Sequence, residues 1–517
     1  MTPPVIIFGI DGGTFNIIDP LMAQGRLPHL AKVKAEGAAG KLYSVYPPLT
    51  APAWASFMTG LNPGRHGVFD FLAPPGRGYH RRLQNASALS QPRIFDTLSS
   101  VGRRVGSINV PLTFPPRPVN GFVIPGMLTP KLDDGYLYPT SLGEELRRVG
   151  EYHIDMDPAN YEEGRDEPFI EDLYRVEEAR KKAALHLMRT HAPELFVVIF
   201  TGVDRLMHFF WDQPEKVAEH YVWLDATLGE FLEAGGPDAT TFVVSDHGFG
   251  PVEGEVDLGR HLIDHGFMTL RDKKGPTPRG FMDTIAKLDV FNLRKRLPGR
   301  WRDSARGRVM EKLSVFAAVD WSKTTAFPGT ATQYGVYLNV AGREPEGIVK
   351  REDYGRVRDD LVASLDELHP GMTARALGRE EVYHGPLLDE APDLYLPLWE
   401  DGIRLKEFSD DPAVAPRRAR PGEHRREGII FARGPAVLPA STPEAATLED
   451  IYPTAMYLMG QAVPAGLDGR VLAEIVRPDA LADEPPAYQD YDVGGVGYAD
   501  GEDAEVRARL EGMGYLG

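Results

Sequence analysis

Three short runs of apolar residues, rich in β-branched and aromatic side chains, constrain the fold of this 517-residue chain most strongly. They cover Val5 to Ile10, Leu195 to Phe200 and Thr241 to Val244, and a polar loop follows each one. Helical patterns lie between them, and this alternation predicts an α/β domain with a largely parallel sheet. Because the strands are apolar throughout, helices should cover both faces. We therefore expect an α/β/α sandwich with a mostly parallel central sheet and a helical insertion.

Acidic residues follow these strands, and their positions predict where a ligand binds. Asp11, Asp204 and Asp246 come shortly after the first, second and third runs. In open α/β sheets ligands bind at the carboxyl ends of the strands. The three carboxylates should therefore meet at one edge of the sheet.

The chain is longer than one hydrophobic core usually supports, so a large domain with insertions, or two domains, is expected. We divide it into a first core part (1–270), a basic amphipathic helical insertion or lid (271–314), a second core part (315–480) and an acidic Gly-rich tail (481–517). Two interpretations of residues 271–312 stay open. They form either a solvated lid or a basic face for peripheral contact with anionic lipid or an anionic substrate. The tail wraps the surface or mediates homo-oligomer formation.

Composition excludes several classes of function. The formal charge of −18 argues against a broad nucleic-acid-binding surface, which needs a basic face. There is no cysteine, so any metal must bind to His, Asp or Glu. The N-terminus lacks a basic region before its short apolar run, and no apolar run is long enough to cross a bilayer. We expect a cytoplasmic protein.

Two motifs near the N-terminus hold residues that could serve either a purely structural role or a role in binding and catalysis. In VIIFGIDGG, Asp11 closes a strand before two glycines, where an Asp commonly serves as a turn former. In YPPLTAPAWASFMTG, a Pro-rich loop ends at Thr50 and a helix should begin at Ala51. Thr50 would then be an N-cap, with its hydroxyl in the positive field that attracts phosphate to helix N-termini.

Three further motifs hold histidines beside acidic or basic residues. In TGVDRLMHFFW, Asp204 and His208 are one helical turn apart and can point at one ion. In SDHGFGP, Asp246 and His247 follow a strand, where a buried pair is costly without a partner such as a metal. In RPGEHRREG, His424 lies in a predicted loop, where a single histidine is usually only a surface residue.

The five segments and their order resemble the alkaline phosphatase superfamily. The IFGIDGG, PPLTAPAWASFMTG, TGVDRLMHFFW and SDHGFGP segments are most similar to the type I phosphodiesterase and nucleotide pyrophosphatase branch, including its cytosolic phosphohydrolase or phosphomutase relatives. The resemblance covers about residues 4–270 and 315–475. It implies a metal-dependent phosphohydrolase acting on a small phosphorylated substrate.

The resemblance also implies roles for individual residues. One metal would be held by Asp204, His208 and His424, and a second by Asp11, Asp246 and His247 with the Thr50 oxygen beside it. Thr50 would attack phosphorus to give a phosphothreonine, which water then hydrolyses. The nitrogen and oxygen ligands suit two zinc ions, with manganese or iron as alternatives.

The chain departs from this branch close to Thr50. Nucleotide pyrophosphatases have an Asn shortly after the nucleophile, whereas Ala51, Pro52, Ala53 and Trp54 follow here. Candidates for the missing phosphate contact are Asn109, after the apparent strand Val105 to Ile108, and Arg205 and Arg425 beside metal ligands. The sulfatase branch is disfavoured because its nucleophile is a modified Cys or Ser.

Three activities remain open at this stage. The chain hydrolyses a phosphate monoester or diester, or it passes the phosphoryl group to an alcohol as a phosphomutase or phosphotransferase. A non-catalytic metal-binding regulatory protein of the same fold is the alternative outside enzymes.

Overall fold

The computed structural model describes residues 3–74, 79, 82–129, 134–161, 164–271, 318–406 and 420–493. Its centre is a seven-stranded sheet. In spatial order the strands are β2 (Ala38–Tyr43), β15 (Glu427–Arg433), β6 (Thr240–Val244), β1 (Val5–Ile10), β5 (Leu195–Phe200), β3 (Val105–Val110) and β4 (Gly121–Pro125). The five strands from β6 to β4 are parallel, whereas β15 is antiparallel to both β6 and β2. The predicted mostly parallel sheet is confirmed.

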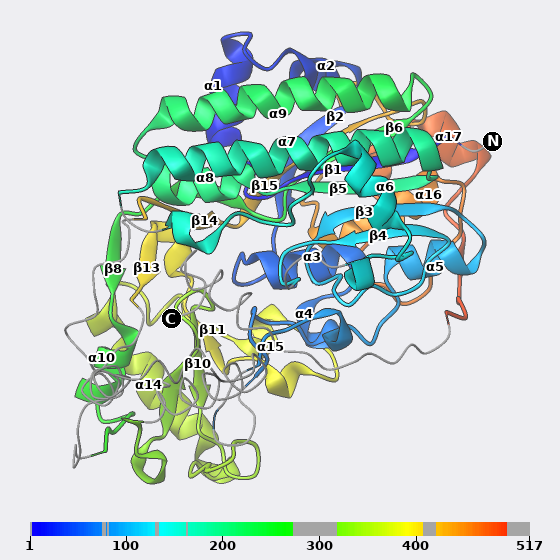
Figure 1. The fold of residues 1–517 in the computed structure, drawn as a ribbon. Helices are drawn as coiled ribbons and strands as arrows, with labels where there is room; N and C mark the ends of the chain where they lie inside the picture. The colour runs from blue at the N-terminus through cyan, green and yellow to red at the C-terminus, as the bar shows by residue number, and fades with distance from the viewer. Residues whose placement is uncertain are drawn as a thin grey trace, which may run out of the picture.

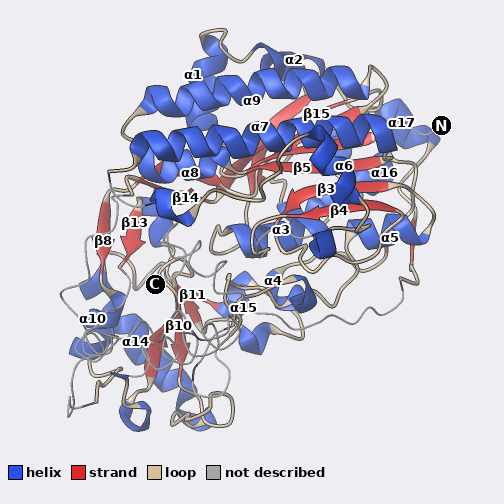
Figure 2. Cartoon of the chain, in the orientation of Figure 1, coloured by secondary structure: helices blue, strands red, loops and turns tan. Residues whose placement is uncertain are grey.

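Helices cover both faces of this sheet, which gives the expected α/β/α sandwich (Figures 1 and 2). One face carries α1 (Phe15–Ala23), α2 (Pro28–Glu36), α6 (Leu142–Val149), α7 (Asp166–His191), α8 (Gly202–Phe210) and α9 (Pro214–Gly235). The other face carries α3 (Thr50–Thr59), α4 (Pro63–His66), α5 (Ile94–Ser100) and α16 (Ile451–Leu458). One apolar cluster joins both layers to the sheet.

Strand β1 lies at the middle of this core, and all six of its residues are buried. Gly9 within it allows a close approach, because a Cβ there would lie 2.9 Å from the Trp54 ring of α3. Helix α3, which begins at Thr50, therefore packs directly against strand β1, which Asp11 follows. This packing brings the two N-terminal motifs to the same edge of the sheet.

Residues between the main-sheet strands β6 and β15 build a second lobe with its own apolar cluster. Its four-stranded sheet has the order β11 (Leu377–Gly378), β12 (Leu394–Tyr395), β10 (Gly335–Leu338) and β9 (Ala326–Pro328), accompanied by α10 (Leu258–Asp264), α14 (Tyr354–Leu368) and α15 (Arg379–Val382). The stretch predicted as the second core part thus contains the lobe first and returns to the main sheet at β15. The predicted insertion at 271–314 lies almost wholly outside the described residues.

The second lobe contacts the loop that precedes Thr50. The Trp399 and Tyr46 rings lie 6.0 Å apart between centroids, and the Tyr383 hydroxyl accepts a hydrogen bond from the Tyr46 N–H at 3.0 Å. The described residues also form three two-stranded sheets. They are β7 (Gly248–Pro251) with β14 (Gly422–Arg425), β8 (Gly254–Val256) with β13 (Ile403–Leu405), and β16 (Val463–Pro464) with β17 (Tyr488–Gln489). Helix α17 (Pro478–Asp483) crosses the boundary between the predicted second core part and the predicted tail, and the tail residues beyond 493 lie outside the described part.

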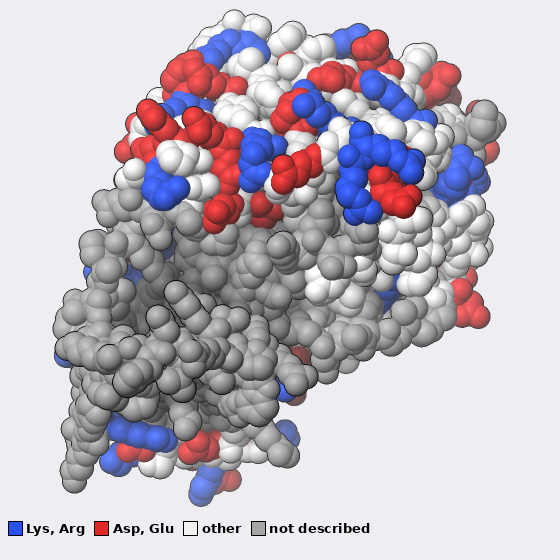
Figure 3. Space-filling model, in the orientation of Figure 1, with Lys and Arg blue, Asp and Glu red and all other residues white. Residues whose placement is uncertain are grey.

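The described surface over α7 and α9 carries charges of both signs. Figure 3 shows Lys and Arg interspersed with Asp and Glu there, and α7 holds several such pairs, including Lys181 with Glu178 at 3.0 Å. In the part of the chain that the structure describes, no helix is both long enough and apolar enough to cross a membrane.

Candidate active site

Three neighbouring parallel strands of the main sheet deliver the acidic residues singled out in the sequence. Asp11 follows β1, Asp204 lies in the first turn of α8 after β5, and Asp246 follows β6. All three side chains are at most 1% exposed. Their meeting at the carboxyl ends of these strands agrees with the binding edge expected for an α/β sheet.

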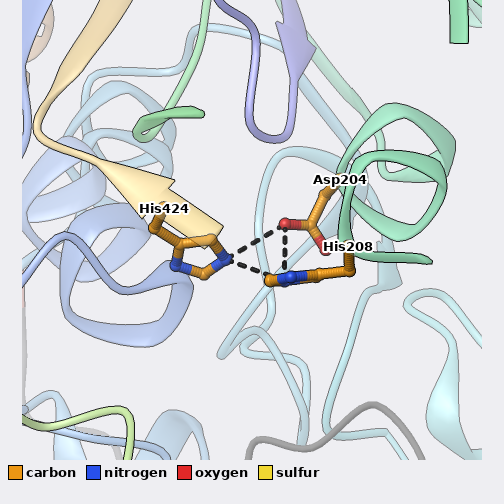
Figure 4. Close-up of side chains that lie close together, drawn as sticks. All are labelled: Asp204, His208 and His424. Atoms are coloured by element: carbon orange, nitrogen blue, oxygen red, sulfur yellow. Dashed lines mark hydrogen bonds and ion pairs between the residues drawn. The ribbon is translucent and has the colours of Figure 1, made fainter. Parts of the chain in front are cut away.

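The first group of possible metal ligands consists of Asp204, His208 and His424. The His424 Nε2 lies 3.2 Å from the Asp204 Oδ1 and 3.0 Å from the His208 Nε2, and the His208 Nε2 lies 3.3 Å from the same oxygen. Figure 4 shows the carboxylate and both rings facing one another. Two ligands about 2.1 Å from a tetrahedral ion lie about 3.4 Å apart, so these separations are close to those of a metal site.

The placement of His424 in a loop was wrong. It lies in strand β14, which is antiparallel to β7 with His424 opposite Phe249. This pairing directs the His424 ring from one strand toward Asp204 and His208 on helix α8. The histidine is buried, at 4% exposed, and is not a surface residue.

A second group lies beside the first and shares Asp204 with it. The ligand atoms of Asp11, Asp204 and His247 all lie within 4.8 Å of one another. The His247 Nε2 is 3.5 Å from the Asp11 Oδ1 and 3.3 Å from the Asp246 Oδ2. The expected ligands are therefore brought together, and Asp204 also reaches the group to which it was not assigned.

The three histidines share one orientation. Their Nδ1 atoms lie 2.8 to 3.2 Å from backbone carbonyl oxygens: Gly422 for His208, Gly248 for His247 and Pro48 for His424. For His247 and His424, donation from Nδ1–H leaves Nε2 with a lone pair directed at the carboxylates. Metal-binding histidines commonly have this arrangement, because the second nitrogen fixes the ring and its tautomer.

The carboxylates are poorly compensated without a cation. Neither oxygen of Asp11 nor the Oδ2 of Asp246 has a hydrogen-bond partner among the described residues. Burial raises the pKa of Asp11 well above its ordinary value, and Asp246 and Asp204 raise it further. Burial likewise raises the pKa of Asp246 to about 7. Burial also opposes ionisation of Asp204, but His208 and His424 hold its pKa well below its ordinary value. This donor set fits divalent metal ions, which would compensate the buried charge.

Thr50 lies at the edge of this cluster. The helix begins one residue earlier than predicted, so Leu49 is the N-cap and Thr50 is the first residue of α3. The prediction that Thr50 caps the helix was wrong, because its hydroxyl is turned to the site and lies 3.3 Å from the His247 Nε2. The first turn of α3 still offers the backbone N–H groups of Thr50 and Ala51, whereas Pro52 has none.

The three predicted phosphate contacts have other partners in the structure. Asn109 is buried at the end of β3, where its amide donates to the Ile199 carbonyl at 2.9 Å. Arg205 donates to both Asp155 oxygens at 2.7 Å, and Arg425 donates to the carbonyls of Glu423, His424 and Pro251. Both arginines therefore hold protein groups around the candidate ligands, and a substrate contact for either stays a prediction. A substrate contact for Asn109 stays a prediction.

Two charged residues beside His424 were missed in the sequence. An Arg420 nitrogen lies 2.7 and 3.0 Å from the two ring nitrogens of His208, and a Glu423 oxygen accepts from the His424 N–H at 3.1 Å. Both lie in a run of charged residues that has the composition of an exposed loop. Only the pairing of β14 with β7 reveals that Glu423 is buried.

The fold and the buried Asp and His cluster define a metal-dependent phosphohydrolase with an alkaline phosphatase-like architecture. The sequence pattern of one family matches residues 5–412, which is most of the chain, although it ends before His424. The chain belongs to the type I phosphodiesterase / nucleotide pyrophosphatase family.

Solved structures of low sequence identity share this fold. Human ectonucleotide pyrophosphatase/phosphodiesterase 5 is 13% identical with a TM-score of 0.53, over 92% of this chain and 100% of that one. Phosphonoacetate hydrolase from Sinorhizobium meliloti 1021, in complex with phosphonoformate, is 17% identical with a TM-score of 0.57, over 89% and 95%. An inactive threonine-to-alanine variant of murine ectonucleotide pyrophosphatase/phosphodiesterase 5, in complex with AMP, is 14% identical with a TM-score of 0.52, over 92% and 100%. No curated protein matches the chain.

Proposed function

We propose that the protein hydrolyses a phosphate monoester or diester at a two-metal site through a phosphothreonine formed on Thr50. Asp204, His208 and His424 would hold one ion, and Asp11, Asp246 and His247 the other, with the Thr50 oxygen beside it. The Asp204 carboxylate belongs to both groups of candidate ligands. Zinc is the proposed metal, since imidazole and carboxylate ligands suit it, with manganese or iron as alternatives.

One observation carries this proposal. All three histidines turn Nε2 toward carboxylates whose oxygens are buried and, at Asp11, have no hydrogen-bond partner among the described residues. An isolated buried carboxylate is strongly unfavourable, and only a cation between these groups would compensate all of them together. Three carboxylates and three imidazoles form a larger donor set than one tetrahedral ion needs.

The chain's own residues supply the other parts of the reaction. The Thr50 hydroxyl loses its proton to solvent as its Oγ1 bonds to phosphorus. The bond from phosphorus to the leaving oxygen breaks, and that oxygen takes a proton from solvent. The first-turn N–H groups of Thr50 and Ala51 would stabilise negative charge on the phosphoryl oxygens, whereas Pro52 has no N–H to contribute. Bound divalent ions would supply Lewis-acid stabilisation of the attacking and leaving oxygens. Water then attacks the phosphothreonine and frees Thr50.

The substrate class is a small phosphorylated molecule. Two of the similar structures are complexes with AMP and with phosphonoformate, and the AMP complex carries a threonine replacement that makes that enzyme inactive. These properties belong to the relatives, but they favour a nucleotide-like or phosphonate-like substrate here and a catalytic role for Thr50. An alcohol in place of water would make the same site a phosphotransferase or phosphomutase.

The test combines metal analysis with a substrate panel. Purified wild type, Thr50→Ala and Thr59→Val are assayed on phosphomonoesters, phosphodiesters and sugar phosphates, with and without an added alcohol acceptor. Thr59 is the matched control, because its hydroxyl donates to the Ala55 carbonyl at the far end of α3. We expect bound divalent metal in all three proteins and loss of turnover only in Thr50→Ala. A metal-free active enzyme, full activity of Thr50→Ala, or a phosphothreonine trapped elsewhere would contradict the proposal.

Three further expectations remain proposals from the sequence. Residues 271–312 are proposed to contact anionic lipid, and pelleting with anionic liposomes, with and without that segment, tests this. Self-association is proposed for the tail and is tested by light scattering of the full chain and of a chain ending at 480. The cytoplasmic location is tested by fractionation of the native host cells.

A further inference from the structure

Two ion pairs are buried at the start of α8, the helix that carries Asp204 and His208. Glu177 and Arg180 pair within α7, with side chains 2% and 0% exposed. Asp155 and Arg205 pair at 2.7 Å, with side chains 2% and 3% exposed. Replacing a buried ion pair with apolar residues of similar size is often neutral or stabilising, so stability alone does not explain these charges.

Both pairs converge on Thr201, the N-cap residue of α8. The Thr201 N–H donates to the Glu177 carboxylate at 3.3 Å, and Arg180 donates to the Thr201 hydroxyl at 3.4 Å. From the other pair, Arg205 donates to the Thr201 carbonyl at 3.1 Å. Figure 1 shows α8 lying beside α7, the helix that contributes Glu177.

The position of Asp204 in α8 connects these contacts at Thr201 to the candidate metal site. Counting from Thr201 as N-cap, Asp204 is the third helical residue, N3. In a capping box the N3 carboxylate reaches back and accepts from the N-cap N–H. Here Asp204 faces His424 and His208 at 3.2 and 3.3 Å, and Glu177 of another helix accepts from Thr201 instead.

We infer that Glu177 is a positioning residue that takes over the capping role of Asp204 and so leaves the Asp204 carboxylate available to the metal. Arg180 holds Glu177 in place and compensates its charge, and Arg205 fixes the first turn of α8 from the other side. Without Glu177, the Thr201 N–H loses this acceptor, and the first turn of α8, which carries Asp204 at N3, loses a contact that fixes it. The inference rests on the proposed metal site.

The decisive variant is Glu177→Leu with Arg180→Met, which removes both charges while keeping side-chain volume. Glu178→Gln is the matched control, since Glu178 follows on α7, is 35% exposed and pairs with Lys181 and Lys182. Metal-free proteins are titrated with Co²⁺ against a competing chelator. Affinity and the visible spectrum of the bound ion are measured, with circular dichroism and thermal unfolding as checks of the fold.

We expect the double variant to fold and to bind Co²⁺ about 10- to 100-fold more weakly, as other residues that orient metal ligands do, with an altered spectrum. The control should match wild type. A folded double variant with wild-type affinity and spectrum would overturn the inference while leaving the metal site intact. If wild type itself binds no Co²⁺, the proposed function fails, and this inference fails with it.

A second variant covers the case in which the double variant does not fold. Glu177→Gln keeps the shape and one acceptor oxygen but loses the negative charge, and charge-assisted hydrogen bonds are about twice as strong as neutral ones. We expect a smaller loss of Co²⁺ affinity than in the double variant, at least about threefold. Wild-type affinity in this variant would overturn the inference.

Discussion

Replacing Asp246 tests the metal interpretation through the stability of the metal-free protein. The residue is fully buried, its Oδ1 accepts from the Gly12 N–H at 3.1 Å, and its Oδ2 has no hydrogen-bond partner among the described residues. Burial raises its pKa from 3.8 to about 7, with a smaller contribution from Asp204. Without metal, the folded protein therefore pays to keep this group ionised.

The sign and size of the effect follow from the two pKa values. Between pH 3.8 and about 7 the folded state keeps the Asp246 proton, while the unfolded state has lost it. The free energy of unfolding therefore falls as pH rises through this window. Each pH unit is worth about 1.4 kcal/mol, so the penalty at pH 8 is about 4 kcal/mol.

Asp246→Asn removes this penalty without changing the shape of the side chain. The amide oxygen can keep the bond to Gly12. The amide nitrogen takes the place of the Oδ2, 3.3 Å from the His247 Nε2, where it can donate to that lone pair. Metal-free Asp246→Asn should exceed metal-free wild type in stability by about 4 kcal/mol at pH 8. It should also lose metal binding and turnover.

The assay is urea unfolding of chelator-stripped proteins between pH 4.5 and 8.5, with Asp212→Asn as an exposed control. The advantage of the variant should shrink as pH falls toward 4.5, and added metal should raise the stability of wild type alone. The reasoning is refuted if the metal-free variant is no more stable than wild type at pH 8. It is also refuted if the advantage does not change with pH.

Three other predictions follow from single contacts. Thr50→Ser should keep part of the hydrolytic activity, whereas Thr50→Val should lose at least about a thousandfold in kcat with its metal content unchanged. Burial lowers the pKa of His220 to about 3, so protonation of this histidine in the unfolded state should lower the free energy of unfolding by about 1.4 kcal/mol for each pH unit below 6.5. In His220→Phe the urea midpoint should therefore depend less on pH between 6.5 and 4.5. An unchanged pH dependence would contradict this. Gly12 has a φ of +74°, and a Cβ there would lie 3.2 Å from Met207 and Phe249. Gly12→Ala should therefore lower the free energy of unfolding, measured by thermal unfolding, by about 1–3 kcal/mol and weaken metal binding. Wild-type stability and wild-type metal affinity in this variant would show that the alanine is not strained.

The sequence predicted the strands that position the site because their signal is local. Val5 to Ile10 and Leu195 to Phe200 are continuous apolar runs and match β1 and β5 at both ends, and Thr241 to Val244 is one residue short of β6. The acidic residues after them follow from the same pattern, since parallel strands end at a common edge. Fold class and the approximate position of the ligands therefore required no knowledge of distant contacts.

The remaining parts depend on contacts between distant residues. His424 lies in a polar, Arg-rich segment, and only pairing with β7, more than 170 positions earlier, makes that segment a buried strand. Glu177 lies in a charged helical stretch typical of a solvated face, and its burial depends on the packing of α7 against β5 and α8. The start of α3 was predicted at Ala51, one residue too late, because the residues at a helix end give only a weak local signal.

The position of β15 has a consequence for how this protein is made. Among the described residues, strand β2 has no main-sheet neighbour other than β15, so residues 38–43 cannot join the sheet until residues 427–433 have been synthesised. Until then β6 is an open edge, and such edges pair readily with other chains. The nascent protein is therefore exposed to aggregation at this edge while the second lobe is translated, and β14, which carries the proposed metal ligand His424, is made immediately before β15.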